Sequence, residues 1–109
     1  MSSTKRREKI EALLADDPKD QFLRYGLACE FDNEERFDES VSLFEGLTKD
    51  PIPHVASFLR GAQLLVRLDR VSEARTWLRE GIEAARTQGN GHAAGEMAEL
   101  LSQLGALGE

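Results

Sequence analysis

Cysteine and histidine, the side chains that most often hold metal ions in proteins, are scarce in this chain. It has one cysteine, Cys29, and two histidines, His54 and His92. One cysteine cannot close an internal disulfide, and the histidines do not have the spacing of a zinc site. We therefore expect no structural metal. A single free cysteine agrees with a reducing compartment, and we expect a cytoplasmic protein.

Motifs that carry catalysis are missing as well. The sequence has no Gly-x-Ser-x-Gly turn, and both histidines fall at the starts of predicted helices, where a solvated imidazole is the ordinary role. A Gly-x-Gly-x-x-Ala run begins at Gly89, but a helical segment precedes it where a dinucleotide site needs a strand. We predict no catalytic residue and no cofactor, and keep a small enzyme only as a remote alternative.

Positive charge and long apolar runs are also lacking. The formal net charge is -6, and the one basic run, residues 5–7, is short. Nucleic-acid binding depends on clustered Lys and Arg, so a nucleic-acid partner is disfavoured, and the basic run is expected to cap and solubilise the first helix. Charged residues follow this run at once, and no segment approaches the length of a membrane span. Neither a signal peptide nor a membrane partner is expected.

The sequence does contain a regular helical pattern over its whole length. The 109 residues are 40% hydrophobic, which suits a single domain over 1–109 with its own core. Apolar residues recur at helical spacing in six blocks, separated by turn or cap residues near 17, 33, 51, 69 and 89, and no block alternates like a strand. The pattern predicts an all-α fold of about six antiparallel helices. Asp17 and Pro18 predict the cap and first turn of the second helix.

The blocks repeat with a period of 34 residues. Shifted by this distance, residues 36–40 align with 70–74, Ala28 with Ala62, and Phe44 with Leu78, so that apolar falls on apolar and small on small. Helical pairs of this length cannot bury their apolar faces alone, so neighbouring pairs must stack.

In these positions the chain resembles the tetratricopeptide repeat (TPR) family, whose pattern sets small and large apolar residues at fixed places of a helix pair. The resemblance implies an α-α superhelix with an N-terminal helix over 4–17, repeat 1 over 18–51, repeat 2 over 52–88 and a C-terminal capping helix over 91–107. The two outer helices would each be half of a repeat. Arg24 and Gly61 depart from the pattern, since the family has large apolar residues there, and Pro51 comes one residue early.

The resemblance also implies a binding surface, because the first helices of such repeats line a concave groove that holds a peptide or a helix of a partner. The corresponding positions are Phe22, Tyr25, Cys29, Asp32, Leu59, Arg60, Gln63 and Arg67. The final helix would add His92, Glu96, Glu99 and Ser102.

Arg60 and Arg67 leave two interpretations open. They are expected either to bind an acidic group of the partner or to pair with glutamates of the chain itself. Trp77 is predicted at the edge of the packed face, as cover for the core or as a second contact site.

Three functions follow from this sequence. The first is a protein-interaction module or adaptor for a protein or peptide of unknown identity. The second is an accessory or regulatory subunit of a larger assembly, in which the half repeats stack on another chain or on a second copy. The third is the small enzyme. The lysine and asparagine with which some relatives clamp the tails of chaperones are absent, so that role is disfavoured.

Overall fold

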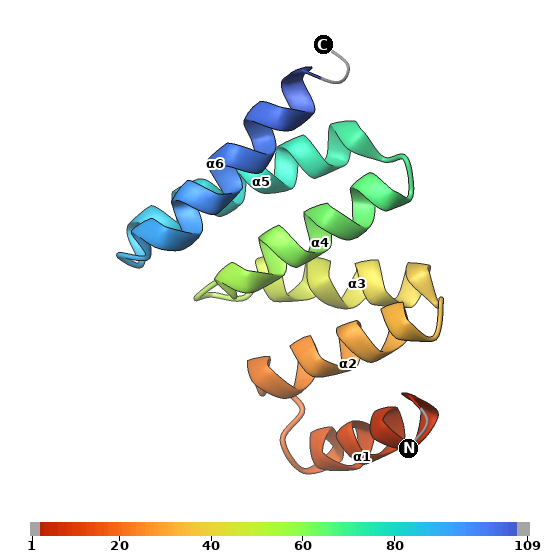
Figure 1. Cartoon of the computed structure of the whole chain (residues 1–109). Helices are drawn as coiled ribbons and strands as arrows, with labels where there is room; N and C mark the ends of the chain where they lie inside the picture. The colour runs from red at the N-terminus through yellow and green to blue at the C-terminus, as the bar shows by residue number, and fades with distance from the viewer. Residues whose placement is uncertain (1–2, 107–109) are drawn as a thin grey trace.

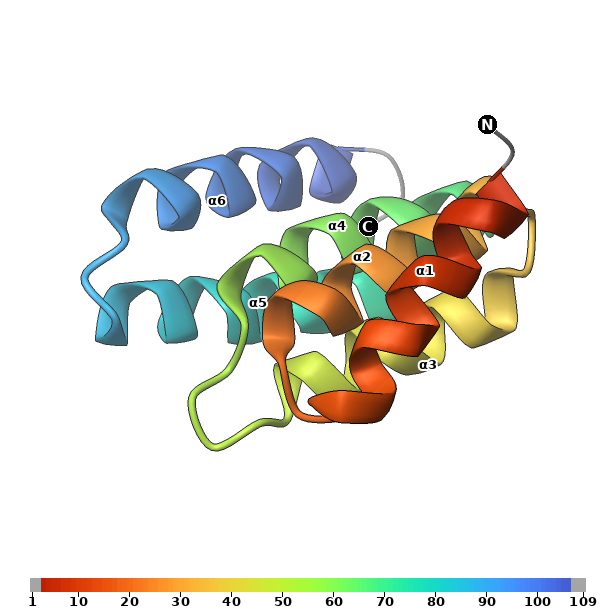
Figure 2. The same ribbon diagram turned by 90° about the horizontal axis from the view of Figure 1, so that it is seen from below.

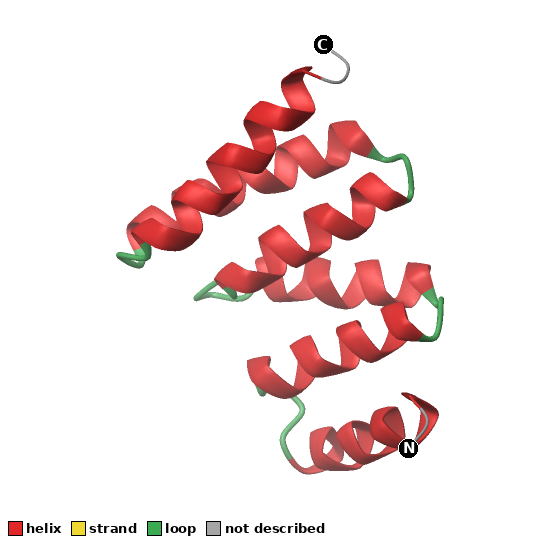
Figure 3. Ribbon diagram, viewed as in Figure 1, coloured by secondary structure: helices red, strands yellow, loops and turns green. Residues whose placement is uncertain are grey.

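The computed structural model describes residues 3–106, and over this range it contains six α-helices joined by short loops and no strand (Figures 1 and 3). The helices are α1 (Ser3–Asp16), α2 (Gln21–Asn33), α3 (Phe37–Thr48), α4 (Val55–Arg67), α5 (Val71–Thr87) and α6 (Gly91–Ala106). The predicted all-α fold is confirmed. The predicted end of the last helix at 107 lies outside the described residues.

The helices stack in chain order, each running back along the one before it (Figure 1). Seen at right angles, α2, α4 and α6 lie on one side of the stack and α3 and α5 on the other (Figure 2). Within the described chain, α6 packs on α5 and also touches α4. The result is an elongated body of 41 × 29 × 20 Å, in which the helices of one side can form a common surface.

The turns between paired helices repeat with the sequence. Glu35 and Asp69 stand 34 residues apart, and both have positive φ, 60° and 61°. After each of them the next backbone N–H reaches back to the preceding helix, Arg36 to the Phe31 carbonyl and Arg70 to the Leu65 carbonyl, both at 2.8 Å. This left-handed turn satisfies carbonyls that the helix end leaves without partners. The division of the helices into repeats and half repeats remains a prediction.

The start of α2 differs from the prediction. The helix begins at Gln21, and its N-cap is Asp20, whose Oδ1 accepts the Leu23 N–H at 2.8 Å. Pro18 therefore lies in the preceding turn, and the prediction of Asp17 as the cap is wrong. Both aspartates are suitable N-cap residues by type, and only the loop path decides which one aligns with the free N–H groups of the first turn.

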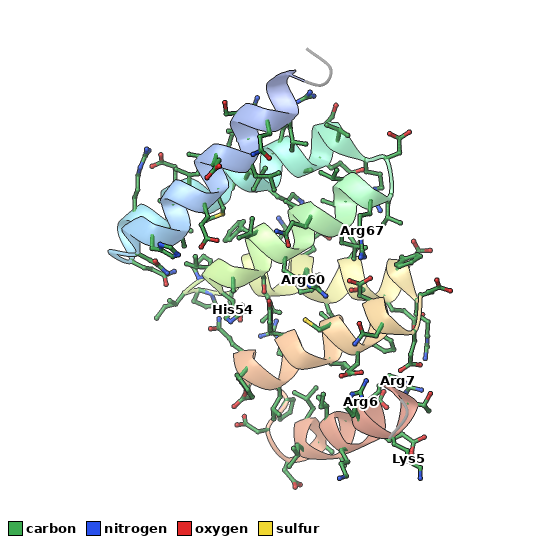
Figure 4. All side chains as sticks on the ribbon, in the orientation of Figure 1. Lys5, Arg6, Arg7, His54, Arg60 and Arg67 are labelled. Carbon is green, nitrogen blue, oxygen red and sulfur yellow. The ribbon has the colours of Figure 1, made fainter. Side chains whose placement is uncertain are left out.

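Charged side chains help to attach helix α1 to α2. Arg6 and Arg7 lie between α1 and α2 (Figure 4). Arg6 donates to Glu30 at 3.1 Å and Arg7 to Glu34 at 2.8 Å, and the Arg7 guanidinium lies over the Phe31 ring. Arg6 and Arg7 of the basic run, which was expected to cap and solubilise the first helix, thus join it to α2.

A small residue meets a small residue where paired helices cross. Ala28 and Ser40 are fully buried, and the Ser40 hydroxyl donates to the Ala28 carbonyl at 2.7 Å; Ala62 and Ala74 are their equivalents and are fully buried too. These contacts bring α2 against α3 and α4 against α5.

Trp77 corrects the sequence-based view of this residue. Its side chain is only 8% exposed, so it does not stand at an edge where a partner would touch it. The indole lies against Gly61, which leaves room for it. In repeat 1 the same two positions hold Leu27 and Leu43. A pair of medium side chains is therefore replaced by a glycine and a tryptophan, which explains why Gly61 departs from the family pattern.

Candidate functional site: a groove along helices α4 and α6

Two adjoining cavities lie where α4 faces α6. The first has a volume of about 210 Å³ and is lined by Tyr25, Val55, Ala56, Leu59, Arg60, Gln63, Asn90, Ala93, Glu96 and Met97. The second, also about 210 Å³, is lined by Leu59, Gln63, Glu96, Glu99, Leu100 and Gln103. They share Leu59, Gln63 and Glu96, so they form one continuous depression, which we call the α4–α6 groove.

The structure brings part of the predicted surface together here. Tyr25, Leu59, Arg60 and Gln63 line the groove, joined by Glu96 and Glu99 of the last helix. The other members of the predicted set do not line it: Phe22, Cys29, Asp32, Arg67, His92 and Ser102.

Phe22 has 81% of its surface accessible at the start of α2. It lies outside both cavities.

Tyr25 forms the α2 side of the groove and is held between two rings. Its centroid lies 5.7 Å from that of Phe44, edge-on, and 5.0 Å from that of His54. Burial raises the pKa of the Tyr25 hydroxyl above its usual range. A phenol fixed in this way offers a rigid contact surface with one polar atom at little cost in conformational entropy.

Cys29 sits one turn further along α2, half-buried beside Tyr25 and Arg60. Burial raises the pKa of its thiol, against a smaller opposing effect of the Arg60 charge. Because the thiolate is the reactive form, the Cys29 side chain behaves here as a small apolar group rather than as a nucleophile.

Arg60 and Arg67 are paired within the chain. Both point from α4 towards α2 (Figure 4), where Asp32 receives them: Arg60 Nη2 lies 3.2 Å from Oδ2, and Arg67 Nη2 bonds to Oδ1. The Asp32 side chain is 5% exposed. The arginines thus satisfy a buried carboxylate that would otherwise be strongly unfavourable, and their partner is this aspartate instead of the expected glutamates.

The apolar floor of the groove comes from residues that the sequence did not assign to the binding surface. Val55, Ala93 and Leu100 are partly buried against the core, and Met97 is fully buried. The sequence shows apolar residues at helical spacing in both helices. This spacing does not predict that α6 approaches α4 closely enough to form a shared cavity.

The acidic side of the groove is formed by α6. Glu96 and Glu99 are both exposed and lie about one helical turn apart, on the same face. Glu96 pairs with His92 at 3.1 Å, but the His92 side chain is 89% exposed and the pair lies in solvent. An ion pair of this kind contributes little.

One pair of side chains resembles part of a catalytic site. His54 Nδ1 lies 2.7 Å from Ser57 Oγ, and burial lowers the pKa of the imidazole. However, Ser57 is fully buried, so its hydroxyl cannot meet a substrate. Since His54 is the N-cap residue of α4 and Ser57 stands in its first turn, the pair is best explained as a contact that organises the helix start.

A larger hollow, about 720 Å³, lies at the loops before α2 and α4 and includes Arg24, Asp50 and Ile52. Asp50 accepts Arg24 Nη1 at 2.7 Å and Nη2 at 3.1 Å, and this arginine lowers the pKa of the carboxyl group. The departure of Arg24 from the family pattern is thereby explained, since it ties α2 to the loop that leads into α4. Gln21 and Arg24 of this hollow are both hydrogen-bonded to Asp50, so volume alone does not make it the better site.

Two further observations concern the described residues as a whole. No three His, Cys, Asp or Glu side chains between residues 3 and 106 converge as metal ligands do. None of the helices in this range has the length and apolar character needed to cross a membrane.

Two solved structures are similar to this chain over most of its length, and both are of a tetratricopeptide repeat domain protein from Salinibacter ruber. The solution NMR structure aligns with a TM-score of 0.78 and 31% sequence identity, covering 84% of this chain and 93% of that chain. The crystal structure aligns with a TM-score of 0.74 and 31% identity, covering 83% of this chain and 100% of that one. No family model and no curated protein matches the sequence.

Proposed function

The chain belongs to the tetratricopeptide repeat family, a fold of the protein-interaction kind, and from this premise we propose that it is a non-catalytic module that holds a partner polypeptide in the α4–α6 groove. The observation that carries the proposal is the continuity of the groove. Its two cavities share three lining residues and combine an apolar floor with polar sides, as sites for extended peptides or single helices do.

The charge distribution supports a protein partner over a nucleic acid. The net charge is -6, and the two arginines nearest the groove are bound to Asp32. The groove also presents the amides of Gln63 and Gln103 and the exposed carboxylates of Glu96 and Glu99. A cytoplasmic location belongs to the same proposal and rests on the single cysteine.

Selection of peptides from a random library on the immobilised protein, followed by NMR titration of the selected peptides, tests the proposal. We expect the amide signals of Leu59, Gln63 and Glu96 to shift. Gln63→Trp should weaken binding without disturbing the core, because this exposed side chain stands where the cavities join. Ile52→Trp is the matched control, since Ile52 is also exposed (70%) but lies in the hollow at the loops. Selected peptides that shift signals elsewhere, or that bind the Gln63→Trp variant unchanged, would refute the groove.

The second candidate is an accessory subunit of a larger assembly. It is favoured by three large apolar side chains on the outer surface: Leu13, Phe22 and Ile52 are 55%, 81% and 70% exposed. Exposed apolar side chains of this size are used at permanent interfaces. Light scattering on the purified chain distinguishes the two functions, because a module that acts alone stays monomeric, whereas an obligate subunit self-associates or precipitates.

A further inference from the structure

We propose that the segment bound in the α4–α6 groove is basic and apolar, with lysine or arginine side chains directed at Glu96 and Glu99 and an apolar anchor against Tyr25 and Leu59. This inference rests on the proposed function, and it reverses the acidic partner that Arg60 and Arg67 suggest when the sequence is considered alone.

The arginines are not free to recruit an acidic partner. Asp32 accepts one hydrogen bond from each guanidinium and is almost fully buried, so both arginines are needed to satisfy its two oxygens. A carboxylate from a partner would have to compete with Asp32 for the two arginines. Among the described residues, Asp32 is paired with no cation other than Arg60 and Arg67. Competing with a preorganised internal group is unfavourable for the newcomer.

The carboxylates of α6 are available. Over residues 3–106, Glu99 forms neither an ion pair nor a hydrogen bond, and Glu96 has only the solvent-exposed pair with His92. The charged residues that line the two cavities are Glu96, Glu99 and Arg60, and the charge of Arg60 is balanced by its ion pair with Asp32. The groove therefore presents uncompensated negative charge, and its electrostatic complement is a cation.

The shape of the groove suits the side chains of lysine and arginine. Leu59 and Leu100 lie in the same cavity as the two carboxylates, so an aliphatic stem can pack on leucine while the charged head reaches a carboxylate. Arginine can also bind a carboxylate through two parallel hydrogen bonds. At the other end of the groove Tyr25 and Leu59 border the apolar cavity, where an uncharged anchor fits.

Three fluorescein-labelled peptides of equal length test the inference. They share the same leucine and serine positions and differ only in carrying arginine, glutamine or glutamate at the remaining positions. Fluorescence anisotropy should give the order arginine, glutamine, glutamate from tightest to weakest, with the first at least about tenfold tighter than the last at low salt. The preference should shrink as salt is raised.

Charge reversal in the groove supplies the decisive comparison. The Glu96→Lys, Glu99→Lys double variant should bind the glutamate peptide more tightly than the arginine peptide. The matched control is Glu8→Lys with Glu80→Lys, which changes the net charge equally at two exposed positions outside both cavities and should keep the original order.

The outcomes separate the inference from the proposed function. Equal binding of the three peptides, tighter binding of the glutamate peptide to the unmodified protein, or the same reversal in the control variant would overturn the basic partner and leave the groove standing. If none of the peptides binds, the groove itself is overturned together with the inference.

Discussion

Replacing Gly61 with alanine should destabilise the protein, although alanine is the better helix former. Gly61 lies inside α4 and faces Trp77 of α5, which is 8% exposed. A Cβ at residue 61 would stand 2.2 Å from Trp77 Cζ3 and 2.7 Å from Cε3, whereas ordinary contact begins at 3.4 Å. The indole must move by about 1.2 Å, the difference between the contact distance and the shorter of these two.

The expected magnitude follows from two opposing effects. Forcing an extra carbon into a packed core costs about 1–3 kcal/mol, because side chains leave their preferred rotamers. Alanine offsets roughly 1 kcal/mol of this through its higher helix propensity. Since Trp77 is rigid and enclosed, we place the net loss in the free energy of unfolding at about 1–2 kcal/mol, with a fall in Tm of roughly 4–8 °C for each kcal/mol.

Urea unfolding followed by circular dichroism measures this loss, and Gly95→Ala is the matched control. Gly95 is also inside a helix, α6, but nothing lies within 4 Å of the place its Cβ would take. This control should gain about 0.5–1 kcal/mol, because only the propensity effect remains. The two variants add the same atoms, so the difference between them isolates the contact with Trp77.

Trp77→Leu provides a second check on the same contact. In the Gly61→Ala background, shortening residue 77 should cost less than it does in the unmodified protein, since it relieves the clash. Equal stabilisation by Gly61→Ala and Gly95→Ala, or additive effects of the substitutions at 61 and 77, would show that the indole does not pack on Gly61.

Further predictions concern a turn, a titration and the internal carboxylate. Glu35→Gly should raise the free energy of unfolding by about 0.5–1 kcal/mol in urea titrations, because glycine adopts the positive φ of 60° without a Cβ clash; a loss would contradict the left-handed turn. His54→Gln should flatten the pH dependence of stability below pH 6.5. Burial lowers the pKa of His54 from 6.5, with a smaller raising effect of Asp50. The free energy of unfolding is therefore unaffected by His54 titration above pH 6.5, and it decreases as the pH drops towards the folded-state pKa, because the unfolded chain binds the proton first. Equal slopes for variant and unmodified protein in urea titrations across this range would contradict the prediction. Asp32→Asn should cost about 1–3 kcal/mol, since two guanidinium groups lose their charged acceptor; an unchanged urea midpoint would contradict the internal pairing.

The helical architecture was predictable from the sequence because its causes are local. Apolar residues at helical spacing, breaks at glycine, proline and acidic turns, and a period of 34 residues all act within a few residues of each other or between adjacent segments. The same period aligned Ala28 with Ala62, and both are fully buried. The N-cap of α2 was missed by three residues, because two aspartates met the local rule and the loop path chose between them.

The site was predictable only in part. The periodic frame selected Tyr25, Leu59, Arg60 and Gln63, and all four line the groove. The cavities themselves depend on how closely α6 approaches α4, which no residue pattern within either helix determines.

Helical spacing and the 34-residue period were enough to predict a stack of helices, and the family resemblance implied a common face of α2, α4 and α6. The tertiary structure decided which charges on that face are free. Asp32 and Arg67 are 35 positions apart, and only the packing of α4 on the preceding helices brings the buried carboxylate between its two arginines. Because a charge that has a partner inside the protein no longer attracts one from outside, this contact removes the two arginines from the available charges and leaves the carboxylates of α6.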